Sequence, residues 1–312
     1  MASILILGSG GQLGFELMRQ RWPTPLLPVG RTRVACDIAD PTSVDQALAE
    51  TRPALIVNAA AYTAVDRAET EPEAAFRTNR DGPAVLGAAC ARHGIPLIHV
   101  STDYVFDGSK PGSYQEDDPV APLGIYGQSK RAGEVALAEA WPEHVVLRTA
   151  WVFGAHGNNF VKTMIRLGTE RDSLRVVEDQ RGCPTPSDSL AEAIRTIAAA
   201  ILRGDGAWGI YNYAGDEAIT WHGFAATIFE RLAARTGRAP VLTPIPTSDY
   251  PTPARRPANS VLDCRRIGQA YGIAPAAWRA GLDRVMAELL GPPSASRAVS
   301  RTAALAGSGG AG

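Results

Sequence analysis

The sequence predicts an α/β protein with a doubly wound parallel sheet, followed by a smaller C-terminal α/β domain. Short apolar runs typical of buried strands alternate with helical patterns through the first 150 residues. A glycine-rich turn follows the first apolar run and opens the first helix. After residue 151 this regular alternation stops, which indicates a second unit.

The first half predicts strands and helices in strict alternation. Apolar runs predict strands at residues 4–7, 26–29, 54–58, 96–101 and 144–148. Helical spacing predicts helices at residues 12–21, 43–49, 73–92 and 129–140. Thr42 or Ser43 is the expected cap of the second helix, and Gly94 is the expected stop of the third.

The second half predicts a less regular unit. Helices are expected at residues 160–170, 187–202, 221–236 and 278–290, with a short strand at 210–213. The proline-rich segment 240–257 predicts an extended loop without regular structure. We therefore expect a nucleotide-binding domain at 1–150 that also takes helix 187–203, a substrate-binding domain at 151–290, and a disordered tail at 291–312.

Composition excludes several classes of protein. The chain has 312 residues, of which 45% are hydrophobic, and a net charge of −1, so no basic surface for nucleic acid is expected. No apolar stretch approaches the ~18–20 residues of a membrane span, and the N-terminus does not resemble an export signal. The four cysteines are scattered, which is typical of reduced thiols in a cytoplasmic protein.

The opening glycine motif predicts a dinucleotide site in a Rossmann-type sheet. Gly8, Gly11 and Gly14 follow the first strand directly and precede a helix. In this context the first glycine permits a tight turn, the second admits a pyrophosphate and the third lets the helix pack on the strand. The free N–H groups of the helix N-terminus then face the phosphates.

The end of the second strand leaves the choice of nicotinamide cofactor open. A carboxylate there would bind the ribose of NAD, but the strand ends at Gly30 and Arg31. Arg31 suits the 2′-phosphate of NADP, although a solvated surface arginine would look the same in the sequence. We expect NADPH or NADH, with NADPH favoured.

Three residues predict the reacting groups. Tyr126 and Lys130 are four residues apart, on one face of any helix that begins there. An ammonium beside a phenol lowers the pKa of the phenol, which makes it a usable proton donor. Thr102 follows the fourth strand, at the edge of the sheet where ligands bind, and can hydrogen-bond a carbonyl or the Tyr126 hydroxyl.

Together these segments resemble the extended short-chain dehydrogenase/reductases and, within them, the dTDP-4-dehydrorhamnose reductase family. The resemblance covers about residues 3–290. Besides the glycine motif, it is carried by Val-Asn-Ala-Ala-Ala-Tyr-Thr-Ala-Val-Asp at 57–66, Ser-Thr-Asp-Tyr-Val-Phe-Asp-Gly at 101–108, Tyr-Gly-Gln-Ser-Lys at 126–130, Arg-Thr-Ala-Trp-Val-Phe-Gly at 148–154 and Tyr-Pro-Thr-Pro-Ala-Arg-Arg-Pro-Ala-Asn-Ser at 250–260.

The resemblance implies a set of site residues. Tyr126 would be the proton donor, with Lys130 and Thr102 as its partners. With Gly8, Gly14 and Arg31 from the motif and the strand end added to the residues that the resemblance implies, the cofactor would contact Gly8, Gly11, Gln12, Leu13, Gly14, Arg31, Asp37, Ile38, Ala61, Tyr62, Thr63, Tyr126 and Lys130. A dTDP-sugar would contact Thr102, Asp103, Tyr104, Val105, Phe106, Trp151, Asn159 and Arg256.

Several of these residues have a plain structural alternative. Trp151 is as readily a core tryptophan as a platform for the sugar or base. Asn159 is as readily a helix cap as a substrate contact, and Arg256 is as readily a surface charge as a clamp on the diphosphate. These alternatives stay open at this point.

The resemblance also implies a possible metal and a possible homodimer. Some relatives bind Mg²⁺ between subunits, and Glu16, Asp188 and Glu288 fall at the matching positions. Three isolated acids are more often a solvated surface.

The expected reaction is reduction of dTDP-4-dehydro-L-rhamnose to dTDP-L-rhamnose with NAD(P)H, the last step of dTDP-L-rhamnose synthesis. One rival is another sugar-nucleotide reductase, epimerase or 4,6-dehydratase of the same fold. The dehydratases carry a carboxylate pair after the threonine, whereas here Asp103 is followed by Tyr104. The other rival is a non-catalytic protein like the regulatory β subunit of methionine adenosyltransferase, which the intact reacting groups argue against.

Overall fold

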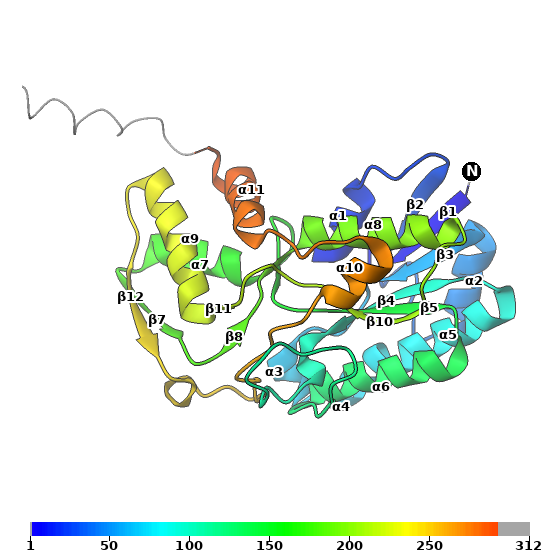
Figure 1. The fold of residues 1–312 in the computed structure, drawn as a ribbon, viewed down its shortest axis with the longest axis horizontal. Helices are drawn as coiled ribbons and strands as arrows, with labels where there is room; N and C mark the ends of the chain where they lie inside the picture. Colours follow the sequence, from blue (N-terminus) through cyan, green and yellow to red (C-terminus); the bar gives the residue numbers. More distant parts are fainter. Residues whose placement is uncertain (1, 293–312) are drawn as a thin grey trace, which may run out of the picture.

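A six-stranded parallel sheet forms the centre of the larger lobe (Figure 1). The computed structural model describes residues 2–292. The strand order is β10-β5-β4-β3-β1-β2. The strands are β1 (Ala2–Leu7), β2 (Leu26–Arg31), β3 (Pro53–Asn58), β4 (Leu97–Thr102), β5 (His144–Thr149) and β10 (Gly209–Asn212). The predicted α/β class and parallel sheet are confirmed.

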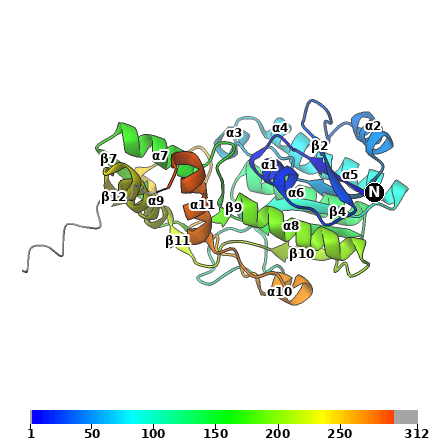
Figure 2. The same cartoon turned by 90° about the horizontal axis from the view of Figure 1, so that it is seen from above.

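Helices cover both faces of this sheet, which is why its strands are apolar on both sides. Ile4 and Ile6 of β1 belong to one buried cluster, and Leu5 and Leu7 belong to another on the opposite face. In Figures 1 and 2, α1 and α8 lie on one side of the sheet and α2, α5 and α6 on the other. These helices are α1 (Gln12–Arg19), α2 (Pro41–Thr51), α5 (Gly82–His93), α6 (Ile125–Ala140) and α8 (Ser187–Leu202).

The expected helix at 73–92 is three helical segments. They are α4 (Pro72–Phe76), the π-helical η1 (Arg77–Asp81) and α5. Within η1, Asn79 is buried and its amide bonds both the backbone of Tyr62 and the hydroxyl of Ser129. A π turn adds a residue to the helix and so re-aims its side chains, which is frequent at functional sites. The predicted stop at Gly94 is confirmed, with φ of 64°.

The cap of α2 is Asp40, not Thr42 or Ser43. The Asp40 carboxylate accepts a hydrogen bond from the Thr42 N–H at 3.0 Å. Pro41 occupies the first position of the helix, where its missing N–H costs nothing. The periodic pattern predicted a helix from residue 43, two residues after the observed start at Pro41.

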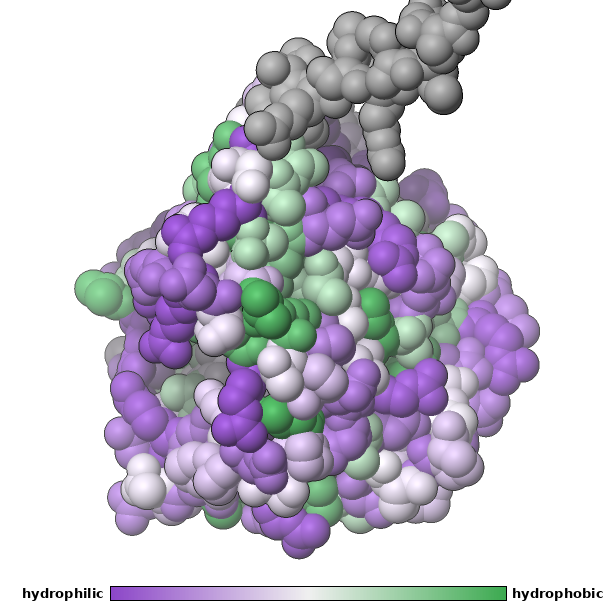
Figure 3. All heavy atoms as spheres, turned by 90° about the vertical axis from the view of Figure 1, so that its left-hand side faces the viewer, coloured by the Kyte–Doolittle hydropathy of each residue, from purple (hydrophilic) through white to green (hydrophobic). Residues whose placement is uncertain are grey.

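The smaller lobe has its own apolar core. Phe153, Phe224 and Trp278 are among its buried residues. It is formed mainly by α7 (Phe160–Glu170), α9 (Trp221–Thr236), α11 (Trp278–Leu290), β7 (Ser173–Val177) and β12 (Val241–Ile245). Seen from outside, this end of the molecule is largely hydrophilic with small apolar patches (Figure 3).

The proline-rich segment 240–257 contains regular structure that the sequence did not predict. Strand β12 pairs in parallel with β7 from Val241 to Ile245, and η3 (Thr247–Asp249) follows. Proline is tolerated here because β12 belongs to a two-stranded sheet and each strand has a free edge. The remainder is a loop that returns to the larger lobe.

The remaining elements are short. They are α3 (Val65–Ala68), η2 (Asp103–Val105), β6 (Val152–Phe153), β8 (Arg181–Gly182), β9 (Thr185–Pro186), β11 (Ile219–Thr220) and α10 (Arg265–Tyr271). Across residues 2–292, no helix has the length and apolar character needed to cross a membrane. The four cysteines are free and buried. The expected disorder of the tail at 291–312 falls almost entirely on residues 293–312, which lie outside the described residues.

Candidate active site

The glycine motif forms a tight turn between β1 and α1. Gly8 has φ of 79°, and a Cβ at Gly14 would lie 2.1 Å from the Gly8 carbonyl oxygen. Any side chain at Gly14 would therefore push α1 away from the turn. Gly11 caps α1 without a side chain, so the free N–H groups of the helix face the edge of the sheet. This cradle fits the pyrophosphate of a dinucleotide.

The turn lies at the topological switch point of the sheet. Strands β2 and β3 pair with opposite sides of β1, and ligands bind outside the carboxyl ends of the strands at such a point. Arg31 ends β2 here and pairs with Glu50 of α2 at 3.0 Å. Its carbonyl accepts from the N–H groups of Gly8 and Ser9, so Arg31 lies directly beside the turn, with a side chain that is 24% exposed.

Two further predicted cofactor residues hold the rim of the cradle. Asp37 pairs with Arg77 of η1 at 2.7 Å. Ile38 is buried against Gly82, where a Cβ would come within 2.6 Å of the Ile38 side chain.

The segment Ala61, Tyr62 and Thr63 continues from β3 along the same edge. The backbone N–H of Tyr62 is fixed by the Asn79 side chain at 2.8 Å. The Tyr62 hydroxyl points to Glu71 at 2.6 Å on the surface, so its backbone rather than its phenol faces the site.

Tyr126 and Thr102 meet at the start of α6. Tyr126 is the second residue of that helix, and Thr102 is the last residue of β4. Burial raises the pKa of Tyr126 to about 12, against a smaller opposing effect of the Thr102 hydroxyl. Thr102 itself donates to Asp103 at 3.0 Å, and its expected pairing with the tyrosine hydroxyl stays a prediction.

Lys130 lies one turn further along α6 and points into the sheet. Its amine donates to the Val100 carbonyl at 2.7 Å and lies 3.3 Å from Nε2 of His99. Burial lowers the pKa of Lys130 to about 8. The sequence predicted that Lys130 lowers the pKa of Tyr126, but in this structure the amine is turned toward His99 and Val100, and burial dominates at the phenol.

Asp103 offers a free oxygen at the site. Its side chain is 2% exposed, and its Oδ1 accepts the Thr102 hydroxyl at 3.0 Å while Oδ2 has no hydrogen-bond partner. Burial raises the pKa of Asp103 to about 6. A buried carboxyl oxygen without a partner is a candidate contact for a ligand hydroxyl.

A buried ion pair fixes the helix that carries Tyr126. Glu134 of α6 and Arg148 of β5 form two hydrogen bonds, at 2.8 and 2.9 Å, and both side chains are almost fully buried. Ser101 of β4 donates to the same carboxylate at 2.6 Å. Burial alone would raise the pKa of Glu134, but these donors hold it below its usual value. Sequence reasoning missed Glu134 because nothing local distinguishes it from a surface glutamate.

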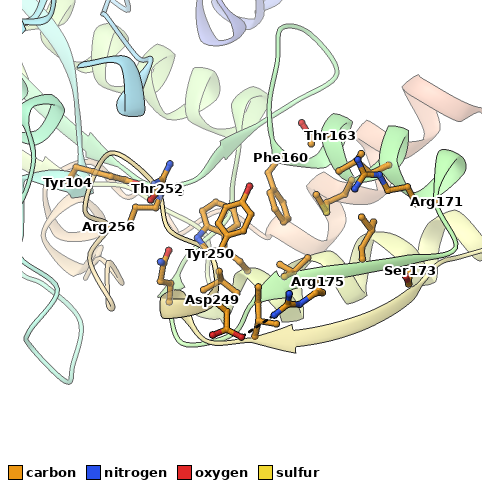
Figure 4. A pocket seen from close by; sticks show the side chains of 18 residues that line it. Tyr104, Phe160, Thr163, Arg171, Ser173, Arg175, Asp249, Tyr250, Thr252 and Arg256 are labelled. Carbon is orange, nitrogen blue, oxygen red and sulfur yellow. Dashed lines mark hydrogen bonds and ion pairs between the residues drawn. The ribbon is translucent and has the colours of Figure 1, made fainter. Parts of the chain in front are cut away.

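A cavity of about 750 Å³ opens beside the catalytic edge and extends into the smaller lobe (Figure 4). Tyr104 and Arg256 line its inner end, and the rings of Tyr104 and Tyr126 meet edge to face at 5.5 Å. Its remaining wall comes from α7, β7 and the 246–256 loop. Figure 4 shows Tyr250 and Phe160 facing this space, Arg171 toward the end opposite Tyr104, and Arg175 beside its ion-pair partner Asp249.

Two stacked tryptophans lie at the cavity, of which Trp221 is part of its wall. Trp151 and Trp221 lie face to face, with ring centroids 3.4 Å apart and an angle of 6° between planes. Trp151 has φ of 49°, in the left-handed region that a bulky residue rarely adopts. Such strain persists where the surroundings impose it and is frequent at functional sites. Trp221 had no sequence signal of its own.

Three predicted substrate residues have other roles here. Val105 and Phe106 are completely buried in the core of the larger lobe, so we correct their assignment to structural residues beneath the loop. Asn159 caps α7 by accepting from Lys162 N–H at 3.1 Å, and its amide donates to Gln12 at 2.7 Å. The capping alternative is therefore confirmed for Asn159, which ties the smaller lobe to the glycine turn.

The acidic residues Glu16, Asp188 and Glu288 do come near one another. Burial raises the pKa of Glu16, with a further contribution from the two other carboxylates. However, Arg19 contacts Glu288 at 3.1 Å and Arg284 contacts Asp188 at 2.8 Å. Among residues 2–292 no three acidic, histidine or cysteine side chains are arranged to hold a metal. The arginines already neutralise these acids, so this arrangement does not fit a Mg²⁺ site within one chain.

Comparison with known families and curated proteins gives a consistent result. The family model described as the RmlD substrate binding domain matches residues 1–290. A dTDP-4-dehydrorhamnose reductase of Sinorhizobium fredii is 43% identical over 92% of this chain and 97% of its own length. The Escherichia coli K12 enzyme of the same name is 40% identical over 92% of this chain and 98% of its own length.

Solved structures agree. The dTDP-4-dehydrorhamnose reductase of Bacillus anthracis, in complex with NADP, has a TM-score of 0.85 at 34% identity and is covered over its full length by 92% of this chain. The UDP-glucose 4-epimerase of Thermus thermophilus, in complex with NAD, has a TM-score of 0.76 at 22% identity over 92% of this chain and 98% of that one. The epimerase shares the fold alone.

Proposed function

This chain belongs to the RmlD substrate-binding-domain family of dTDP-4-dehydrorhamnose reductases, and on that premise we propose how its residues perform the reduction of dTDP-4-dehydro-L-rhamnose to dTDP-L-rhamnose. The observation that carries the proposal is that Thr102 and Asp103, at the carboxyl end of β4, lie together with Tyr126, whose ring meets that of Tyr104 in the cavity wall. A bound nicotinamide cofactor would supply the hydride that adds to C4 of the sugar.

The glycine turn and its neighbours would hold that cofactor. The N-terminus of α1, with Gly11, Gln12 and Leu13, would bind the pyrophosphate. Asp37 and Ile38 would flank the adenine, and the backbone of Ala61, Tyr62 and Thr63 would line the nicotinamide half. Since Arg31 is the one cation at the end of β2, we propose NADPH as the preferred form.

Tyr126 would donate the proton that the sugar oxygen needs. As hydride adds to C4, negative charge develops on O4, and the phenol O–H donates its proton to that oxygen. Thr102 would bond the same phenol, and an ammonium on Lys130 would stabilise the phenolate that is left. Because burial disfavours that phenolate, a nearby positive charge matters more here than it would in water.

The cavity would take the remainder of the nucleotide-sugar. Asp103 Oδ2 is placed for a sugar hydroxyl, and the strained Trp151 offers an apolar face to the ring. Arg256 lines the inner end and would clamp the diphosphate, although it now pairs with Asp66 at 2.8 Å. The cytoplasmic location and the homodimer remain expectations from the sequence.

The test is oxidation of NADPH and of NADH with dTDP-4-dehydro-L-rhamnose, followed at 340 nm, beside Tyr126→Phe. We expect the variant to lose about 10²–10⁴-fold in kcat while it still binds NADPH, because only the proton donor is removed. Tyr211→Phe, which removes a buried phenol oxygen in β10 at the edge of the sheet, is the matched control and should keep most of its activity. A wild-type protein that binds NADPH and does not oxidise it with this sugar would refute the proposal.

A further inference from the structure

A chain of buried polar side chains runs behind the reacting groups. Asn58 ends β3, His99 lies on β4 and Lys130 lies on α6. All three are buried, with at most 1% of any of them exposed. Asn58 Nδ2 lies 3.0 Å from His99 Nδ1, and His99 Nε2 lies 3.3 Å from Lys130 Nζ. The reduction described above uses only the last member of this chain.

The backbone fixes the direction of these hydrogen bonds. The N–H of Ala60 donates to Asn58 Oδ1 at 3.1 Å, so the oxygen of the amide faces Ala60 and its NH₂ group faces His99. An NH₂ group can only donate, and His99 Nδ1 must therefore accept. Burial holds the pKa of His99 well below its usual value, so the ring is neutral and, with Nδ1 accepting from Asn58, carries its one hydrogen on Nε2.

That hydrogen points at Lys130. A protonated Lys130 has three donors and no lone pair. An ammonium at this position would therefore place one of its N–H groups against the Nε2–H of His99, in a site closed to water. A neutral amine accepts from Nε2–H and donates to the Val100 carbonyl at 2.7 Å. Every hydrogen bond from the Ala60 N–H through Asn58, His99 and Lys130 to the Val100 carbonyl then has one donor and one acceptor.

The charged groups around Lys130 do not reverse this preference for the neutral amine. Glu134 on the same helix favours the ammonium, but its carboxylate is already bound by Arg148, Arg131 and Ser101. From β5, His144 lies beyond His99 and acts on its ring. From η2, Asp103 faces Tyr126.

We propose that His99 is a positioning residue whose Nε2–H favours the neutral amine of Lys130 over the ammonium in the cofactor-free protein. The effect of His99 on the reaction rests on the proposed function. Reduction needs the Lys130 ammonium beside Tyr126, so loss of the Lys130 proton sets the alkaline limit of activity. The charge state itself does not depend on any reaction.

The chain has only three lysines, so the charge of Lys130 can be read directly. The full protein, labelled with ¹³C at lysine Cε and free of cofactor, is titrated by NMR, and Lys130 is assigned by the signal lost in Lys130→Arg. Lys110 and Lys162 serve as internal references. We expect Lys130 to titrate well below both, with a midpoint near pH 8.

Two substitutions separate the hydrogen bond from burial. His99→Phe keeps the site dry and removes the donor, so the Lys130 midpoint should rise by about one pH unit. His99→Gln can accept from Asn58 and donate to Lys130, so its midpoint should stay near that of the wild type. If His99→Phe does not fold, Asn58→Leu tests the same point, since it frees His99 Nε2 to accept and should also raise the midpoint.

An unchanged midpoint in the folded His99→Phe variant would overturn the proposal, because burial alone would then set the charge. A wild-type Lys130 that titrates with the other lysines would overturn it as well. In the reductase assay, the alkaline limb of kcat/KM should move with the NMR midpoint in each variant. If the protein reduces no sugar, the NMR result still stands, so failure of the proposed function is distinguishable from failure of this inference.

Discussion

The two lobes that meet at Tyr126 are built in different ways. The larger lobe holds its reacting groups by buried bonds between neighbouring strands and one helix, as in the Glu134–Arg148 pair. The smaller lobe lines its cavity with side chains from helix, strand and loop, and its ion pairs lie on the surface, as in Arg166–Glu170. The reacting side chains are therefore held in place by the sheet and α6, whereas the cavity wall of the smaller lobe is held by side-chain packing.

The largest expected difference concerns these two ion pairs. Glu134→Gln leaves Arg148 buried without its charge partner and should cost about 3 kcal/mol of unfolding free energy. Glu170→Gln, in an exposed pair of the smaller lobe, should change it by less than about 0.5 kcal/mol. Urea unfolding of both variants measures the difference. Equal losses would mean that burial does not distinguish the two lobes.

The same pair predicts a dependence on pH. Folding holds the pKa of Glu134 below its usual value, so its contribution is present above the unfolded-state pKa of about 4.3 and is lost as pH falls further. The wild type should therefore lose stability at acid pH more steeply than Glu134→Gln. Parallel curves for the two proteins would contradict this assignment.

A second comparison concerns one glycine from each lobe. Alanine at Gly14 would meet the Gly8 carbonyl at 2.1 Å, whereas alanine at Gly168 would meet the side chains of Phe229 and Leu232 at 2.8 and 2.9 Å. Backbone cannot yield as side chains can, so Gly14→Ala should lose about 2–3 kcal/mol of stability and most of its NADPH affinity. Gly168→Ala should lose less stability and keep its cofactor affinity in a fluorescence titration.

The third comparison lies in the loop that returns from the smaller lobe. Arg256 lines the cavity, while its neighbour Arg255 is exposed. Arg256→Ala should raise the KM for the sugar nucleotide about tenfold, with little change in the KM for NADPH. Arg255→Ala is the matched control. An equal effect of the two variants would show that net charge, and not a clamp, is responsible.

The smallest expected effect is on the choice of cofactor. Arg31→Ala should raise the KM for NADPH about fivefold and leave that for NADH unchanged, because only the former carries a 2′-phosphate. Arg33→Ala, which removes an exposed charge two residues away, is its control. Equal changes for both cofactors would place Arg31 at another part of the dinucleotide.

Local signals in the sequence were enough for the sheet and for the first site residues. Apolar runs and helical spacing gave the helices at Phe160–Glu170, Ser187–Leu202 and Trp221–Thr236 to the residue. Steric rules at Gly8 and Gly14 made the nucleotide turn recognisable, and the spacing of Tyr126 and Lys130 marked one helical face. Each of these depends on residues close together in the chain.

The features that only the tertiary structure revealed depend on residues far apart in the sequence. Strand β12 and the π turn at Arg77–Asp81 form because of partners elsewhere, against the local propensity. Trp221 meets Trp151, and His99 meets both Asn58 and Lys130, across separations that no periodicity encodes. Hydrophobic pattern and glycine sterics act locally, so the sequence determined the fold class and the nucleotide edge. Burial and hydrogen-bond direction arise only when distant segments meet, so the folded structure alone decided the charge and orientation of the groups behind Tyr126.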